Sequence, residues 1–248
     1  MVNIVKFRYL VAIFIAIFCF FLAATPLAQG SIELRAFNQE IKPMEQANPR
    51  TARAALVCNA TDKNSDAYAL TGWRLPSNVT YRVNSLSAPF SLRSRLGTIV
   101  GNSFTAWSPL TKGVSLARGS DTLVSRARYD GQNIIAWNSL PRSVLGVTYI
   151  WYNPDTNYVA EVDTLLNSRQ PWGWTDPSTL NVDQQCPTTN AYDAQDILTH
   201  ELGHWVGLDD LYTASEEDLT MYGYGARQEL KKDTLESGDS AGVQAIYP

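Results

Sequence analysis

Hydrophobic positions recur with the periods of regular secondary structure from about residue 67 onward. Val79, Tyr81 and Val83 alternate with polar residues, which predicts a half-buried strand. The next segment predicts a helix that covers one face of a sheet, because its apolar residues recur at helical spacing: Phe90, Leu92, Leu96, Val100, Phe104 and Trp107. Short β-rich runs separated by turn residues then predict four strands, within 113–119, 133–140, 145–153 and 158–167.

A second helix is predicted in the segment that starts near residue 190. Asn190 is a suitable N-cap, and Asp193 and Asp196 lie in the first turns, where the helix dipole favours negative charge. Gly207 is suited to ending the helix. Residues 31–66 contrast with these patterns, because they are polar and have little periodicity. We interpret 31–66 as a linker or short pro-segment ahead of one domain, 67–248.

The first 30 residues have the pattern of a secretory signal. Lys6 and Arg8 precede an apolar run that ends near Ala24, and a small-residue site suited to cleavage follows at residues 28–30. The alternative is an uncleaved membrane anchor, because the run is near the lower limit for a spanning helix. In both cases the rest of the chain faces an extracytoplasmic space, and we expect a secreted protein.

Composition narrows the classes of partner. The chain is 45% hydrophobic and 18% charged, which is typical of a globular protein. Its formal net charge is −4 and its basic residues are scattered, so there is no basic surface for nucleic acid. We expect a monomer without a nucleic-acid partner, and contact with a membrane only if the N-terminal segment stays uncleaved.

The predicted second helix carries the only two histidines of the chain. His200 and His204 are four positions apart, so they share one face of the helix and can hold one zinc ion together. Glu201 lies one step around the helix, close enough to accept a proton from water on the same metal. A catalytic zinc takes three protein ligands. A sharp turn at Gly207 would bring the carboxylate of Asp210 back as the third.

This stretch resembles the metzincin zinc signature, HExxHxxGxx(H/D), from His200 to Asp210. A second landmark of that family, a tight turn with a methionine beneath the metal, has its counterpart in LTMYGYG, with Met221. Residues 72–84 and 235–248 resemble the first strand and the C-terminal helix of matrixin-type catalytic domains. Matrixins have histidine as the third ligand, whereas aspartate is found in the snapalysin-like metzincins.

The resemblance implies an α+β fold with a twisted mixed β-sheet, an antiparallel edge strand, an active-site helix, the Met-turn and a C-terminal helix. The edge strand would be 145–153, and an extended protein or peptide substrate would lie against it. The implied activity is that of a secreted zinc endopeptidase with Glu201 as general base. The alternative is a secreted or membrane-anchored zinc-binding protein without catalysis.

The resemblance also bears on further metals and on the cysteines. The second, structural zinc of matrixins is not expected, because no histidine lies outside the signature. Calcium held by carboxylates stays open, although no loop supports it. Cys58 and Cys186 form an even pair in the mature chain, and we predict a disulfide. Alternatively, the Cys58 thiolate could keep a precursor latent, but its surroundings lack the Pro-Arg-Cys-Gly pattern of matrix metalloproteinases.

Overall fold

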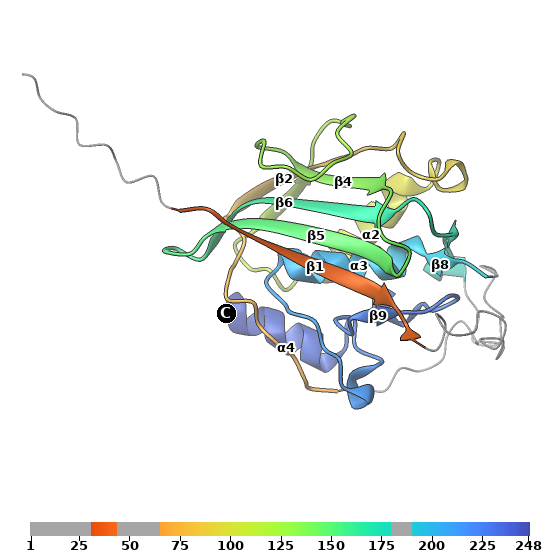
Figure 1. Cartoon of the computed structure of the whole chain (residues 1–248). Coiled ribbons are helices and arrows are strands. Elements are labelled where there is room, and N and C mark those ends of the chain that lie inside the picture. Colours follow the sequence, from red (N-terminus) through yellow and green to blue (C-terminus); the bar gives the residue numbers. More distant parts are fainter. Residues whose placement is uncertain (1–30, 44–64, 180–189) are drawn as a thin grey trace, which may run out of the picture.

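The computed structural model describes residues 31–43, 65–179 and 190–248 (Figure 1). Its main element is a seven-stranded mixed sheet with the strand order β3-β2-β4-β6-β5-β1-β9. These strands are β1 (Glu33–Ile41), β2 (Asn78–Val83), β3 (Ser115–Arg118), β4 (Asn133–Asn138), β5 (Val144–Asn153), β6 (Tyr158–Asn167) and β9 (Tyr224–Gly225). The four strands predicted between residues 113 and 167 are all confirmed.

Three α-helices and some shorter elements complete the described part of the chain. The helices are α2 (Leu96–Trp107), α3 (Ala194–Trp205) and α4 (Ser237–Ile246). A parallel pair is formed by β7 (Trp172–Gly173) and β8 (Tyr192–Asp193). Single 3-10 turns are η1 (Phe90–Leu92), η2 (Pro177–Thr179), η3 (Ala214–Glu216) and η4 (Lys231–Asp233). The predicted α+β class and the mixed sheet are confirmed.

The strand directions differ across the sheet. β3, β2, β4 and β6 are mutually parallel along their pairings, whereas β5 is antiparallel to β6. β1 is antiparallel to β5 and parallel to the short strand β9. The prediction that β5 is the edge strand is therefore wrong. Residues 33–41, expected within a linker or pro-segment, form a strand that covers that edge.

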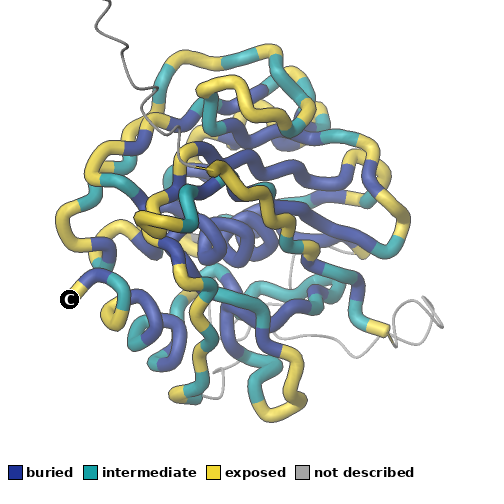
Figure 2. The backbone as a smooth tube through the Cα atoms, turned by 60° about the vertical axis from the view of Figure 1, so that its left-hand side comes forward, coloured by how far each residue is buried: buried dark blue, intermediate teal, exposed yellow. Residues whose placement is uncertain are grey.

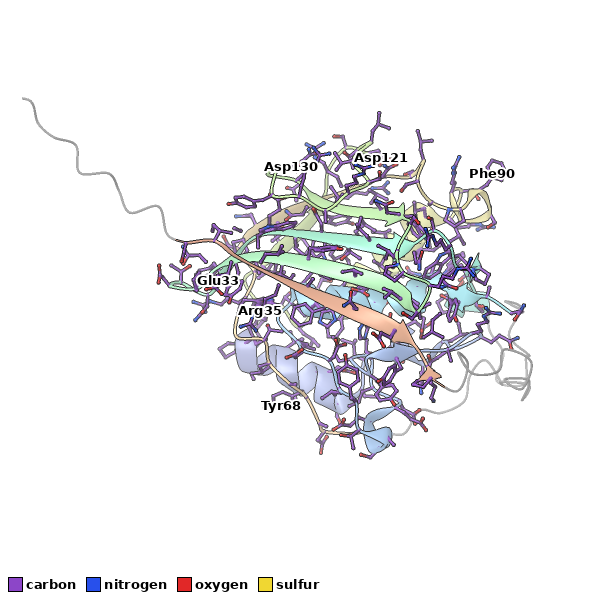
Figure 3. The ribbon with its side chains drawn as sticks, in the orientation of Figure 1. Glu33, Arg35, Tyr68, Phe90, Asp121 and Asp130 are labelled. Atoms are coloured by element: carbon purple, nitrogen blue, oxygen red, sulfur yellow. The ribbon has the colours of Figure 1, made fainter. Side chains whose placement is uncertain are left out.

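The predicted helix at residues 90–107 is shorter than the apolar pattern suggested. Residues Phe90–Leu92 form only a 3-10 turn, and the regular helix begins at Leu96. Arg93 explains the difference, because its guanidinium donates to the carbonyl oxygens of Leu86 and Ala88 and holds the turn against the preceding loop. Phe90 is 86% exposed and projects from the periphery of the molecule (Figure 3).

The main core lies between one face of the sheet and the helices α2 and α3. Two tryptophans join these layers by hydrogen bonds as well as by packing. The indole N–H of Trp107 on α2 donates to the carbonyl of Thr199 on α3, at 2.8 Å. The indole N–H of Trp205 on α3 donates to the hydroxyl of Thr164 on β6, at 2.9 Å. All twelve residues of α3 are buried, and Figure 2 shows this helix and the central strands as the buried centre of the protein.

The opposite face of the sheet is covered by the segment 119–132 over a smaller apolar cluster. Two buried carboxylates of β6 hold this segment through its backbone. Glu161 accepts hydrogen bonds from the N–H groups of Asp130 and Gly131, and Asp163 accepts from those of Arg128 and Ile134. Loop and sheet are thereby joined without a third layer of regular structure.

The predicted C-terminal helix is confirmed as α4. Its last turn is followed by Tyr247, whose hydroxyl accepts a hydrogen bond from the backbone N–H of Leu75, 2.8 Å away. The proposed signal (residues 1–30), Cys58 and Cys186 lie outside the described residues. Within residues 31–43, 65–179 and 190–248, none of the helices has the length and apolar character needed to cross a membrane.

Candidate metal centre

The helix that carries both histidines begins later than the sequence suggested. The N-cap of α3 is Asp193, whose carboxylate accepts hydrogen bonds from the backbone N–H groups of Gln195 and Asp196. Asn190 is therefore not the cap, and its left-handed backbone, with a φ of 60°, places it in the turn before β8. Satisfying two N–H groups from one carboxylate fixes the start of a helix that is otherwise entirely buried.

His200, His204 and Asp210 come together as the sequence predicted. The Nε2 atoms of His200 and His204 lie 3.3 Å and 3.6 Å from Oδ1 of Asp210. One potential ligand atom from each residue lies within 4.8 Å of the others, so the three could hold one metal ion. In the part of the chain that the structure describes, no other group of three His, Cys, Asp or Glu residues has this arrangement.

The backbone fixes the protonation pattern of both imidazoles. Nδ1 of His200 is 2.8 Å from the carbonyl oxygen of Thr220, and Nδ1 of His204 is 2.9 Å from that of Leu208. Because a carbonyl oxygen can only accept, each Nδ1 carries the hydrogen. In the neutral tautomer with this hydrogen, Nε2 of each ring has the lone pair, and both Nε2 atoms face Asp210. This is the orientation that metal-binding histidines adopt when a carbonyl supports them from behind.

The residues present fit a cation. Four buried polar atoms have no hydrogen-bond partner among the described residues: Nε2 of His200, Nε2 of His204, Oδ1 of Asp210 and Oε1 of Glu201. Burial lowers the pKa of His204 to about 4, even though Asp210 acts to raise it, so this imidazole is neutral at neutral pH. Buried polar atoms normally have partners, and two imidazole nitrogens with one carboxylate oxygen are a donor set suited to zinc.

The turn after α3 explains why Asp210 reaches the histidines. Gly207 has a φ of +104°, and a Cβ at this position would lie only 2.5 Å from the carbonyl oxygen of Trp73. Only glycine suits both the conformation and the close approach. The neighbouring Asp209 takes a supporting position, because its Oδ1 accepts the backbone N–H of Asp210 at 2.9 Å.

Two interactions keep the Asp210 carboxylate oriented and ionised. Its Oδ2 accepts a hydrogen bond of 3.2 Å from the hydroxyl of Tyr212, which leaves Oδ1 toward the histidines. Burial acts to raise the pKa of Asp210, but the neighbouring imidazoles and the Tyr212 hydroxyl together lower it below its usual value. This role of Tyr212 was not predicted from the sequence.

Glu201 is placed beside the three candidate ligands and outside their group. Its Oε2 is held by the hydroxyl of Thr148 on β5, at 2.5 Å, while Oε1 has no partner among the described residues. Burial raises the pKa of Glu201 well above its usual range, and the negative charge of Asp210 adds to this effect. A buried carboxyl with a raised pKa and one free oxygen has the properties of a proton acceptor and donor.

Met221 lies in the tight turn beneath the centre and is buried against α3. Its sulfur is so close to Gly203 that a Cβ at that glycine would overlap it. The turn itself is held by Asp239 of α4, whose carboxylate accepts the backbone N–H groups of Thr220 and Met221. Because Thr220 also provides the carbonyl that orients His200, this turn supports the centre directly.

Several residues of the site were not predicted from the sequence. The Phe37 ring on β1 stacks on the imidazole of His204, with centroids 4.5 Å apart and planes inclined by 29°. The Trp73 indole N–H donates to the carbonyl of His204 at 3.0 Å. Gln39, two residues further along β1, is completely buried. Phe37 and Gln39 lie two positions apart on one strand. Two such residues within a polar segment are too few to predict a strand from the sequence.

Comparisons with known proteins give no name for this arrangement: no protein-family model matches the chain, and no curated protein matches it significantly.

Proposed function

We propose that the chain is a secreted zinc-dependent endopeptidase of the metzincin type, with His200, His204 and Asp210 as zinc ligands and Glu201 as general base. The observation that carries the proposal is the separation of roles in the centre. Three donor atoms converge on one point, while the free oxygen of Glu201 stays beside them. A zinc site that only stabilises the fold would have no use for that fourth, unpaired carboxylate oxygen.

The chemistry follows from this separation. Zinc, when bound, lowers the pKa of a water molecule and polarises the carbonyl group of the substrate. Glu201 accepts the proton of the attacking water and delivers it to the nitrogen of the leaving amine. Thr148 holds the other carboxylate oxygen, so that Oε1 stays directed to the reaction. Hydrolysis in this form needs no covalent intermediate.

Fold and turn geometry support the subfamily assignment. The Met221 turn packed against α3, the left-handed Gly207 and the helix α4 after that turn are the features that support the proposal. Aspartate as the third ligand favours the snapalysin-like group over the matrixins. The apolar N-terminal segment with its cleavage pattern supports export from the cell.

The test separates metal binding from catalysis. We expect Glu201→Ala to retain nearly one zinc per chain but to hydrolyse a generic protein substrate at least about 10²-fold more slowly. His204→Ala should lose both properties, because it removes a ligand. Zinc content is measured by metal analysis, and hydrolysis with and without a chelator.

A variant outside the centre provides the control. Glu216→Ala changes a half-buried carboxylate that caps a 3-10 turn, and it should keep both zinc and activity. If zinc is bound stoichiometrically and the unmodified chain hydrolyses no protein, even after a cut between residues 47 and 48 has freed the strand β1 that lies along β5, the non-catalytic alternative is correct. If Glu201→Ala loses zinc and activity equally, Glu201 is a ligand and the assignment of roles is wrong.

A further inference from the structure

β1 occupies the place where an extended peptide would bind beside the centre. It lies between β5 and β9 and pairs with both (Figure 1). Phe37 faces Thr148 in the register with β5, and Gln39 faces Gly146. These are the positions of β5 next to Glu201, since Thr148 holds its carboxylate and a Cβ at Gly146 would overlap it. β1 thus crosses the centre at residues 37–39.

Beyond Gln39 the backbone of β1 is held from both sides. The N–H of Glu40 donates to the carbonyl of Gly223, at 3.0 Å, and the N–H of Lys42 donates to Gly225, also at 3.0 Å. Between them, the N–H of Ile41 turns the other way and donates to Ser143 at 2.8 Å. Alternating backbone bonds to two walls are the means by which proteins hold extended peptides of varied sequence.

β1 also covers the atoms that the proposed chemistry needs. The stacking of Phe37 on His204 closes one side of the centre. Gln39 lies opposite Gly146, the position of β5 at which a Cβ would overlap Oε1 of Glu201. A second peptide could not reach Glu201 while these contacts exist, because β1 already uses the exposed edge of β5 over its whole length.

The side chain of Gln39 shows a poor chemical match to its surroundings. It is completely buried, and its amide nitrogen lies near Gly225, whose other neighbours are the apolar side chains of Leu145 and Ile197. Neither of its amide atoms has a hydrogen-bond partner among the described residues. A permanent core position would carry an apolar residue here, because an unpaired buried amide destabilises the fold. The pocket therefore fits a side chain of this length that is apolar.

The first half of β1 adds few contacts that would make it a permanent strand. Residues 33–36 are all exposed. Their side chains reach only the rim, where Glu33 accepts a hydrogen bond from the hydroxyl of Tyr152 and Arg35 lies over the ring of Trp73. Figure 3 shows Glu33 and Arg35 at the end of the strand that is farther from β9. Such surface contacts contribute little to stability.

We propose that β1 is an internal ligand of the substrate cleft, which blocks the centre until it is released, and that Gln39 occupies the pocket for a substrate side chain. The blocking role rests on the proposed peptidase function, whereas occupancy of the cleft does not. The cleft then takes an extended peptide that runs antiparallel to β5. In place of Gln39, a methionine or leucine binds more tightly, and an aspartate more weakly.

The main experiment releases β1 from the zinc-loaded full chain. A recognition sequence for a specific protease is inserted between residues 47 and 48, so that a cut leaves both pieces present. A fluorescent peptide with the sequence of residues 33–42 is then added, and its binding is measured by fluorescence polarisation. We expect saturable binding to the cut chain and at least tenfold weaker binding to the uncut chain. The Gln39→Met peptide should compete better than the original, and the Gln39→Asp peptide at least tenfold worse.

Substitutions in the uncut chain test the blocking role. Gln39→Asp and Phe37→Ala weaken the hold of β1, and we expect hydrolysis of a generic protein substrate to rise at least tenfold. Asn38→Ala is the matched control, because the Asn38 side chain lies between these two and is exposed. It should leave the rate unchanged.

Each result points one way. If the labelled peptide binds the cut chain with the expected preferences but no form hydrolyses protein, the cleft assignment stands and the peptidase function is wrong. If the peptide does not bind, β1 is an integral strand and the inference is overturned. The same holds if the chain from which β1 has been removed after the cut is already unfolded, which a thermal melt would show as the loss of the cooperative transition. The blocking role would also be overturned if cutting activates the chain but the uncut Gln39→Asp and Phe37→Ala variants hydrolyse protein no faster than the uncut original.

Discussion

The contact between Gly203 and Met221 allows a quantitative test of how the turn supports the centre. Gly203 lies inside α3, where alanine would normally be the more stable residue by about 1 kcal/mol. Here, however, a Cβ would overlap the sulfur of Met221 and lie 3.0 Å from Trp107. Trp107 is hydrogen-bonded to α3 and completely buried, so it cannot move away easily. We expect Gly203→Ala to be destabilising.

A second glycine isolates the packing cost. Gly101 lies inside α2, and a Cβ there would meet nothing within 4 Å. Gly101→Ala should therefore raise the free energy of unfolding by about 1 kcal/mol through helix propensity alone. Overpacking a rigid core costs about 1–3 kcal/mol. Because the propensity gain is common to both variants, the difference between them should equal that packing cost, about 1–3 kcal/mol.

The assay is urea unfolding of both variants and the unmodified chain in the zinc-loaded form. Tryptophan fluorescence reports the transition, and the slopes should agree, so that the midpoints compare stability directly. We expect Gly203→Ala to be the least stable of the three and Gly101→Ala the most stable. Equal stability of the two variants would falsify the claim that Met221 is packed tightly beneath α3.

Three further predictions concern buried carboxylates and a buried lysine. Asp210→Ala should weaken zinc binding, measured by competition with a chelator, by more than about 100-fold. Asp209→Ala should weaken it by about tenfold at most, because Asp209 only supports a ligand. The reverse order would show that Asp209 is the ligand. Burial raises the pKa of Asp163 to about 7. Protonated Asp163 therefore contributes on the order of 4 kcal/mol to the free energy of unfolding, and this contribution is fully present below about pH 4 and is lost as the pH rises through 7. Asp163→Asn should flatten this pH dependence in urea titrations, and an unchanged slope would exclude Asp163 as its source. Lys232 is fully buried, and its Nζ lies 3.4 Å from Oε2 of Glu229. Lys232→Met should therefore lower the free energy of unfolding by about 3–5 kcal/mol, and a decrease below about 1 kcal/mol would contradict a structural role for this pair.

The candidate ligands could be predicted because their geometry is local. His200 and His204 are related by one helical turn, and Asp210 is related to them by one left-handed glycine, so the spacing alone determines that they meet. The strands between residues 113 and 167 were predictable for a similar reason, since each shows its own apolar run. Asn190 was wrongly taken as the cap because Asp193 offers the same chemistry three residues later.

The role of β1 could not be predicted, because it depends on contacts far away in the sequence. Residues 33–41 are mostly exposed and alternate only weakly, so they do not show the pattern of a strand. What makes them a strand is the free edge of β5, more than one hundred residues later, which can pair with nearly any extended backbone. A segment held mainly by its backbone leaves little trace in its side chains.

Buried carboxylates hold the loop and the turn around the candidate metal centre in place. The segment 119–132 is fixed to the sheet by three backbone N–H groups that donate to Glu161 and Asp163, and the Met221 turn by two that donate to Asp239. A metal ion joins chain segments in a comparable way, because it binds ligands from several of them. Buried carboxylates achieve this because one carboxylate can accept hydrogen bonds from several backbone N–H groups. The only two histidines of the chain can therefore both serve the candidate active centre, while carboxylates support the loop and the turn around it.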